Sequence, residues 1–150
     1  MPYVDHKYGK SGSLWEGRYK ASLVQEESYF LKVMKYTELN PVRASMVELP
    51  GHYRWSSFCH NSGEKHIQLI NYHNCYLSLG TNDQARQESY LGLFNIDLSR
   101  DDMKRIRETW QSETPLGNDY FLQKVEPQFA SKVGQTQRGR PSSSEKVGPL

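Results

Sequence analysis

The clearest hydrophobic pattern in the chain lies between Glu26 and Leu39. Apolar side chains and one threonine recur there at intervals of three and four residues, as on one face of an α-helix. These positions are Tyr29, Phe30, Val33, Met34 and Thr37. The pattern predicts a helix that must end or bend at Asn40-Pro41, because the proline ring cannot follow a continuing helix.

A short strand is predicted directly before this helix. Tyr19, Ala21 and Leu23 alternate with polar residues, which is typical of a strand with one buried face. Arg18 and Lys20 would then project from its other face, because successive side chains of a strand point to opposite sides.

A second, shorter helix is predicted directly after the first. Asn40 has a side chain suited to an N-cap, and Pro41 suits the first helical position. This helix would cover residues 42–47 and close at Pro50-Gly51. The expected arrangement is therefore a helix, a sharp corner and another helical turn.

The rest of the chain predicts three more helices after an irregular segment. Residues 51–80 show little periodicity and predict a loop with short helical pieces. Helices are expected over 82–94, after a capping box formed by Ser99 and Asp102, and over 118–125. The side chains expected to be buried are Tyr90, Leu91 and Phe94 in the first of these helices, and Met103, Ile106 and Trp110 along the second.

Composition bounds the class of protein without naming a partner. The 150 residues have the length of one domain, and no run of 18 or more apolar residues could form a membrane span. The net charge of +2 is too small to indicate nucleic-acid binding by itself. Ten tyrosines and three tryptophans stand out, since such rings stack on bases of single-stranded nucleic acid or build a small core.

The histidines and cysteines do not form a recognisable metal site. The candidate ligands are Cys59, His60, His66, His73 and Cys75. They include no Cys-x-x-Cys pair and no His-x-x-x-His spacing, so ordinary loop or core histidines are the favoured interpretation. The sequence also lacks a Gly-x-Ser-x-Gly elbow, a phosphate loop and a dinucleotide fingerprint.

Three segments in a set order carry a family resemblance. They are Ser13–Ala21 with the core Leu-Trp-Glu-Gly-Arg-Tyr-Lys, Lys35–Val47 with Tyr-Thr-Glu-Leu-Asn-Pro-Val-Arg-Ala, and Tyr53–Phe58 with Tyr-Arg-Trp-Ser-Ser-Phe. Together they resemble the second half of the REP-associated tyrosine transposases, the single-tyrosine branch of the HUH enzymes. The resemblance covers roughly residues 3–125.

The resemblance implies an α+β fold, a ferredoxin-like HUH transposase domain. Residues 1–50 would be the C-terminal half of that catalytic domain, 51–130 a helical extension and 131–150 a disordered basic tail, rich in Gly, Ser, Gln and Pro. Since the family's first strands would precede Met1, we expect this chain to be a truncated, mainly α-helical part of a longer transposase with one or two short strands.

The resemblance also implies a nucleophile. In such enzymes a tyrosine attacks a phosphodiester of single-stranded DNA, which leaves a 5′-phosphotyrosine link and a free 3′-hydroxyl. The matching residue is Tyr36, although its spacing also suits a buried aromatic on the packing face of the helix. The expected function is DNA strand cleavage and transfer in transposition.

A divalent metal, Mg²⁺ or Mn²⁺, held by a His-hydrophobic-His pair, assists this step in the family. Asn40, one turn after Tyr36, matches a further ligand position, while its role as a helix cap stays equally open. No His-x-His pair occurs in this sequence, so we expect no tightly bound metal and no cleavage by the isolated chain.

The expected partner is single-stranded or hairpin DNA in the bacterial cytoplasm, at the nucleoid, and no membrane. The residues predicted to contact DNA are Arg18, Lys20 and Arg43 at phosphates, Trp15 at a base, and Arg138 and Arg140 in an Arg-Gly-Arg-Pro segment that resembles minor-groove hooks. Trp15 also suits a core anchor. The alternatives are a non-catalytic DNA-binding module, a decayed remnant without DNA activity, and a helical interaction domain without a DNA partner.

Overall fold

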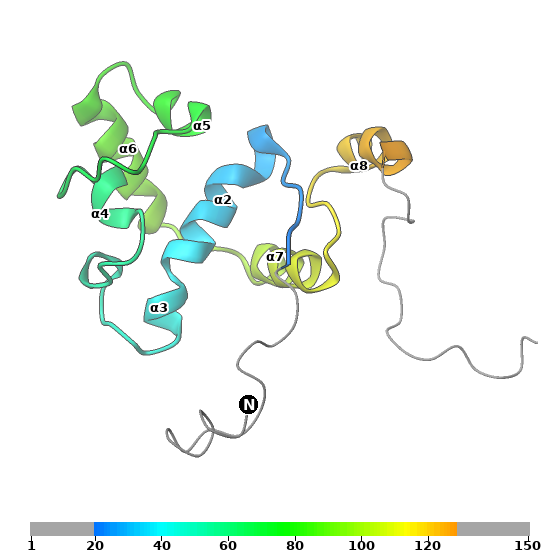
Figure 1. Cartoon of the computed structure of the whole chain (residues 1–150), viewed down its shortest axis with the longest axis horizontal. Coiled ribbons are helices and arrows are strands. Elements are labelled where there is room, and N and C mark those ends of the chain that lie inside the picture. The colour runs from blue at the N-terminus through cyan, green and yellow to red at the C-terminus, as the bar shows by residue number, and fades with distance from the viewer. Residues whose placement is uncertain (1–19, 129–150) are drawn as a thin grey trace, which may run out of the picture.

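The computed structural model describes residues 20–128, and this part of the chain is helical (Figure 1). Its α-helices are α2 (Glu26–Glu38), α3 (Asn40–Arg43), α4 (Phe58–Asn61), α5 (Asn74–Leu77), α6 (Asp83–Phe94), α7 (Arg100–Ser112) and α8 (Asp119–Val125). Two 3₁₀ turns, η1 (Pro50–His52) and η2 (Glu126–Gln128), complete it. The predicted helices over 26–39, 82–94 and 118–125 are confirmed to within two residues.

Helix α2 lies between the other elements (Figure 1). It contacts α5 on one side and α7 on the other, and it leads directly into α3. Within residues 20–128, no helix combines the length and the apolar character needed to cross a lipid bilayer.

The predicted strand before α2 is wrong for the residues described. Between 20 and 128 the structure contains no strand, and Val24 forms only an isolated parallel bridge with Leu116. The amide of Leu116 donates to the carbonyl of Leu23 at 2.7 Å, and Gln25 donates back to Leu116 at 2.8 Å. Ala21 and Leu23 are exposed, opposite to the expected burial.

The expected α+β, ferredoxin-like fold is therefore wrong for residues 20–128. This part of the chain is helical, as the sequence pattern also indicated. A strand needs a neighbour that continues the ladder of hydrogen bonds. Here the neighbour is the connection between α7 and α8, and Asn118 already caps α8 by accepting from the Phe121 amide at 2.9 Å. The pairing therefore ends after one bridge.

The corner after α2 differs in detail from its prediction. α2 ends at Glu38 as Pro41 requires, but Leu39 occupies the N-cap position of α3 and Asn40 is already helical. No side chain caps this helix start. The predicted N-cap role of Asn40 is wrong, because the chain passes from α2 into α3 without leaving the helical region at Leu39.

Helix α3 is also shorter than the predicted 42–47. Ser45 takes a left-handed conformation with φ of 55°, and it ends the helix. The Met46 amide donates to the Pro41 carbonyl and the Ser45 amide to Val42, both at 2.9 Å. This pair of bonds is a Schellman motif, which satisfies the last carbonyls of a helix and turns the chain away.

An aromatic core holds α4, α5 and α6 together. Phe58, Tyr76 and Tyr90 are buried, one from each helix. Phe94 packs edge-on against Phe58 and Tyr90, with centroids 5.0 and 5.2 Å away. Leu91, which the sequence placed in the core, is 40% exposed, so the inner face of α6 is narrower than predicted.

Glu38 on α2 is buried against this core. Its carboxylate accepts hydrogen bonds from the Ser57 hydroxyl at 2.5 Å, from Asn61 Nδ2 at 3.2 Å and from the Tyr90 hydroxyl. Burial raises the pKa of Glu38, although the three hydrogen bonds oppose the shift. The carboxylate thereby ties the C-terminal end of α2 to α4 and α6.

Lys35, one turn earlier, is buried as well. Its ammonium donates to the carbonyls of Leu93, at 2.6 Å, and Ile96 at the C-terminal end of α6. A cation at this position also complements the helix dipole. Burial lowers the pKa of Lys35, and the charge of Asp97 acts in the opposite direction.

Helix α7 covers the other side of α2. One of the two hydrogen bonds of the predicted capping box is confirmed, because the Ser99 hydroxyl accepts from the Asp102 amide at 3.0 Å. Lys32 on α2 forms an ion pair with Asp102 at 2.9 Å. Ile106 is buried as predicted, whereas Trp110 stays 53% exposed.

Candidate functional site

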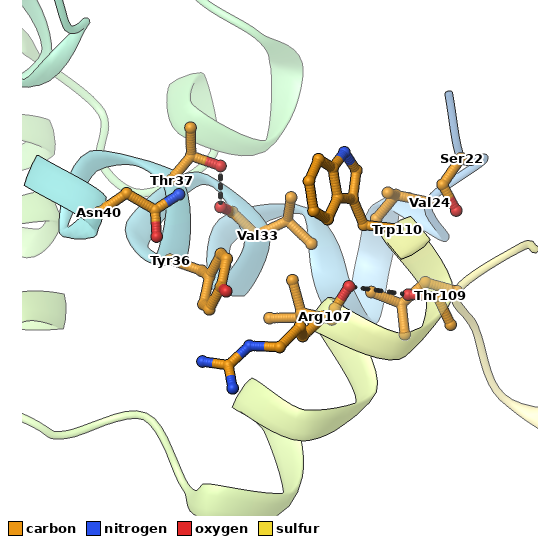
Figure 2. Close-up of a pocket in the computed structure, with 11 residues that line it drawn as sticks. Ser22, Val24, Val33, Tyr36, Thr37, Asn40, Arg107, Thr109 and Trp110 are labelled. Carbon is orange, nitrogen blue, oxygen red and sulfur yellow. Dashed lines mark hydrogen bonds between the residues drawn. The ribbon is translucent and has the colours of Figure 1, made fainter. Parts of the chain in front are cut away.

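A pocket of about 350 Å³ lies where α2 meets α7 (Figure 2). Its apolar lining residues are Val24, Val33, Ile106, Trp110 and Leu116, and its polar ones are Ser22, Tyr36, Thr37, Asn40, Arg107 and Thr109. The α2 residues share one helical face, because they are spaced by three and four positions. The other walls come from α7 and from the segments before α2 and after α7, which are joined by the Val24–Leu116 bridge.

Tyr36, the predicted nucleophile, lines this pocket together with Asn40 and is partly exposed. The Arg43 guanidinium stacks on its ring, with the guanidinium carbon 4.3 Å from the ring centroid. Arg43 Nη2 donates to Asn40 Oδ1 at 2.8 Å and also to the Tyr36 carbonyl. The α2 to α3 corner thus brings a tyrosine, an amide and a cation together.

Arg107 adds a second cation from α7. Figure 2 shows its side chain extending toward the Tyr36 end of the pocket. Loss of hydration lowers the pKa of Arg43, Tyr36 acts to raise it, and the positive charge of Arg107 lowers it further. Within residues 20–128, neither arginine forms an ion pair with a carboxylate. Two like charges without a counter-charge make this end of the pocket attractive to an anion.

The other predicted DNA contacts divide into two groups. Lys20 reaches the end of α7, where its ammonium donates to the Gln111 carbonyl at 3.2 Å and lies 5.3 Å from the centroid of the Trp110 ring. Lys20 therefore contacts a residue of the pocket. The predicted residues Trp15, Arg18, Arg138 and Arg140, and the predicted tail over 131–150, lie outside the described residues.

Sequence reasoning missed the contribution of α7 to this site. Arg107, Thr109 and Trp110 belong to a different helix from Tyr36 and to no motif. The only sequence signal for this contribution is the predicted apolar face of α7, which includes Trp110. The spacing of residues along α7 does not indicate that this face packs against α2 beside Tyr36.

The pocket does not fit the divalent metal that the family resemblance implies. Its lining contains no histidine, carboxylate or thiol, which are the usual ligands beside amides and water. The Asn40 oxygen, the predicted ligand, instead accepts from Arg43. Two guanidinium groups at the same end repel a cation. We therefore derive no reaction step through a metal here.

A different cluster brings three potential ligands together at the N-terminal end of α2. Glu26, His73 and Cys75 each offer one atom, and these atoms lie within 4.8 Å of one another. His73 stacks on Phe30 at 3.8 Å, and its Nδ1 accepts from the Cys75 amide at 3.2 Å. None of these three residues lines the Tyr36 pocket.

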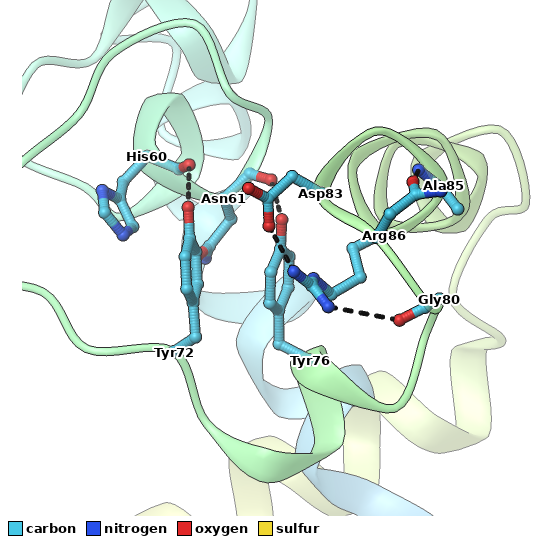
Figure 3. A network of polar contacts seen from close by, with 9 residues as sticks. His60, Asn61, Tyr72, Tyr76, Gly80, Asp83, Ala85 and Arg86 are labelled. Atoms are coloured by element: carbon cyan, nitrogen blue, oxygen red, sulfur yellow. Dashed lines mark hydrogen bonds and ion pairs between the residues drawn. The ribbon is translucent and has the colours of Figure 1, made fainter.

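The polar network around Tyr72 and Tyr76 is structural (Figure 3). The two rings stack with centroids 4.6 Å apart, and Tyr76 donates to the Asn61 carbonyl at 2.7 Å. Arg86 pairs with Asp83 and donates to the Gly80 carbonyl at 3.3 Å. The charges of Arg86 and Asp83 balance each other here, whereas the arginines beside Tyr36 have no carboxylate partner within residues 20–128.

No protein-family model matches the chain, and no curated protein or solved structure matches it either. The resemblance to REP-associated transposases stays a prediction that rests on the three sequence segments. Within residues 20–128, only Lys35–Val47 of these segments contributes residues to the lining of the pocket, namely Tyr36, Thr37 and Asn40.

Proposed function

We propose that this chain is a transposase-type protein that binds single-stranded or hairpin DNA, with a backbone phosphate seated between Arg43 and Arg107 beside Tyr36. The observation that carries the proposal is that Arg107 lines the pocket and Arg43 stacks on the lining residue Tyr36, both without a carboxylate partner within residues 20–128. Guanidinium groups are the side chains best suited to phosphate, because their planar forks donate two hydrogen bonds.

The remainder of the pocket supports a nucleotide rather than a free inorganic anion. The opposite wall is apolar and includes the half-exposed ring of Trp110. Sites for single-stranded nucleic acid combine positive charge along the backbone with aromatic rings for the bases. An isolated phosphate would make no use of that wall.

In this proposal, Tyr36 occupies the position of the family's nucleophile and faces the bound phosphate. The donor set of the pocket does not suit a divalent cation, so binding is the activity proposed for the chain by itself. A covalent phosphotyrosine adduct is not expected under these conditions.

Binding is tested with a fluorescently labelled hairpin oligonucleotide in a salt titration. Arg107→Ala should lower the affinity by at least about tenfold, as expected for a lost charge-assisted hydrogen bond. It should also reduce the slope of log affinity against log salt by about 0.7, the value for one phosphate contact on a single strand. Arg107 makes no hydrogen bond within residues 20–128 that the fold depends on, so its removal should leave the fold intact.

Lys124→Ala on α8 is the matched control, since it removes the same charge from an exposed position on another helix. Equal affinities of the two variants would contradict the proposal, as would a wild-type chain that binds no oligonucleotide at low salt. Incubation with Mg²⁺ or Mn²⁺ and a denaturing gel tests the covalent step separately. A denaturant-resistant adduct that Tyr36→Phe removes would show that the chain cleaves DNA.

A further inference from the structure

A second hollow, of about 530 Å³, adjoins the Tyr36 pocket on the other side of the α2 to α3 corner. Thr37 and Asn40 line both hollows, so the two lie next to each other at these residues. The far wall of the second hollow includes Met46, Tyr53 and Trp55. An aromatic and apolar surface therefore begins where the proposed phosphate site ends.

Trp55 is unusually open for a tryptophan in a folded chain. It remains 73% exposed, and Met46 nearby remains 62% exposed. Large apolar side chains gain stability by burial, so a neighbouring pair left in water is typical of a binding surface. The Arg54 guanidinium lies 4.4 Å from the Trp55 ring centroid and adds a positive charge beside the ring.

The segment that carries Trp55 is held in place by its neighbours. Ser57 donates to the buried carboxylate of Glu38 at 2.5 Å, and Phe58 enters the aromatic core. The Ser56 hydroxyl donates to the Tyr53 carbonyl and accepts from the Phe58 amide, both at 3.3 Å. Trp55 thus projects from an anchored turn, which lowers the entropic cost of using it as a platform.

We propose that Trp55 is a stacking platform for a nucleobase of the DNA strand whose phosphate lies beside Tyr36. The proposal rests on the function proposed above and extends it from the backbone to a base. The occupant is a base because the surface adjoins a cationic site, carries its own arginine and presents a flat aromatic ring. Stacking is tolerant of sequence, because every base has a π-face.

The test compares two labelled strands of equal length, oligo(dT) and a strand of abasic spacers with the same phosphates. Trp55→Ala should weaken binding of oligo(dT) about tenfold, as expected for the loss of one stacked base. Trp55→Phe should recover most of that loss. On the abasic strand, Trp55→Ala should bind as the wild type does, because the backbone contacts are unchanged.

Tyr120→Ala is the matched control, because Tyr120 is an aromatic residue that is 75% exposed on α8. It should leave the affinity for both strands unchanged. If Arg107→Ala weakens binding but Trp55→Ala does not, the stacking platform is wrong while the phosphate site stands. If the wild type binds neither strand, the proposed function fails as well. An equal loss on both strands would overturn stacking in favour of a structural role for Trp55.

Discussion

The charged residues at the aromatic core and those beside Tyr36 differ in how they are balanced. On the face of α2 toward the aromatic core, Glu38 and Lys35 are buried, and uncharged groups of α4, α6 and the adjoining turns satisfy both. On the face toward α7, Arg43 and Arg107 flank Tyr36 with no carboxylate to balance them within residues 20–128.

This difference distinguishes buried charges that stabilise the fold, at Glu38 and Lys35, from exposed charges that remain available to bind an anion, at Arg43 and Arg107. A buried ion without partners is costly, so Glu38 and Lys35 persist only because each has hydrogen bonds inside the molecule. An exposed arginine costs little in stability and keeps its capacity to bind an anion. The core face should therefore be sensitive to mutation in stability, and the pocket face in binding.

The largest expected effect is on the core face. Tyr90→Ala should lower the free energy of unfolding by about 3–5 kcal/mol, because it removes a fully buried ring and a donor to Glu38. Trp110→Ala, on the pocket face, should cost less than about 1 kcal/mol, since its ring is half exposed. Urea denaturation followed by circular dichroism measures both. Similar losses of unfolding free energy in the two variants would contradict the expected difference between the core face and the pocket face.

The buried carboxylate should make stability depend on pH. The pKa of Glu38 is raised on folding, so its contribution is complete below its ordinary value of 4.5 and is lost as the pH rises through the folded value. Glu38→Gln keeps the shape without the charge. The stability of wild type relative to this variant should fall as the pH increases above 4.5, by at most about 1.4 kcal/mol per pH unit.

Denaturation curves of both proteins across this pH range give that difference directly. A difference that stays constant with pH would show that Glu38 does not change its protonation on folding.

At the end of α3, Ser45→Gly should stabilise the protein by about 0.5–1 kcal/mol. Ser45 has a φ of 55°, which a residue with a Cβ adopts only at a cost and glycine adopts freely. Ser78→Gly is the control, because Ser78 follows α5 with a φ of −74° that any residue accepts. Thermal denaturation should rank Ser45→Gly above wild type and Ser78→Gly at or below it. The reverse order would contradict the assigned helix end.

The smallest effect is expected at the ion pair between α2 and α7. Lys32→Met should cost less than about 1 kcal/mol at neutral pH, because the Lys32 side chain is 44% exposed. Burial alone would raise the pKa of Asp102, but hydrogen bonds from Lys32 and Ser99 outweigh it and lower the pKa. The contribution of the pair is present above the ordinary value of 3.8 and disappears as the pH falls through the folded value.

The stability difference between wild type and Lys32→Met should accordingly shrink in acid. A stability cost larger than that of Tyr90→Ala would show that the contact between α2 and α7 matters more for stability than the aromatic core. A cost that grows as the pH falls would contradict the lowered pKa of Asp102.

Local patterns in the sequence predicted local structure well. The spacing from Tyr29 to Thr37 indicated α2, Pro41 indicated its end, and Ser99 with Asp102 indicated the start of α7. Each of these features depends on contacts within one helical turn. The strand before α2 and the cap at Asn40 failed, because both depend on what the neighbouring segment does.

The candidate site was predicted in part. Tyr36, Asn40 and Arg43 follow one another along two joined helices, so their proximity is a consequence of helical spacing. Arg107 and Trp110 reach the same pocket from a helix that is distant in sequence. No spacing rule connects them to Tyr36.

The amino-acid sequence by itself therefore determined which residues share a helical face and where the longer helices α2, α6 and α7 begin. Only the tertiary structure decided which face of α2 is buried, that Glu38 and Lys35 lie inside, and that a second arginine stands beside Tyr36. The physical reason is the range of the interactions. Helical periodicity and capping act over one turn, whereas packing selects partners among segments that the chain brings together only when it folds.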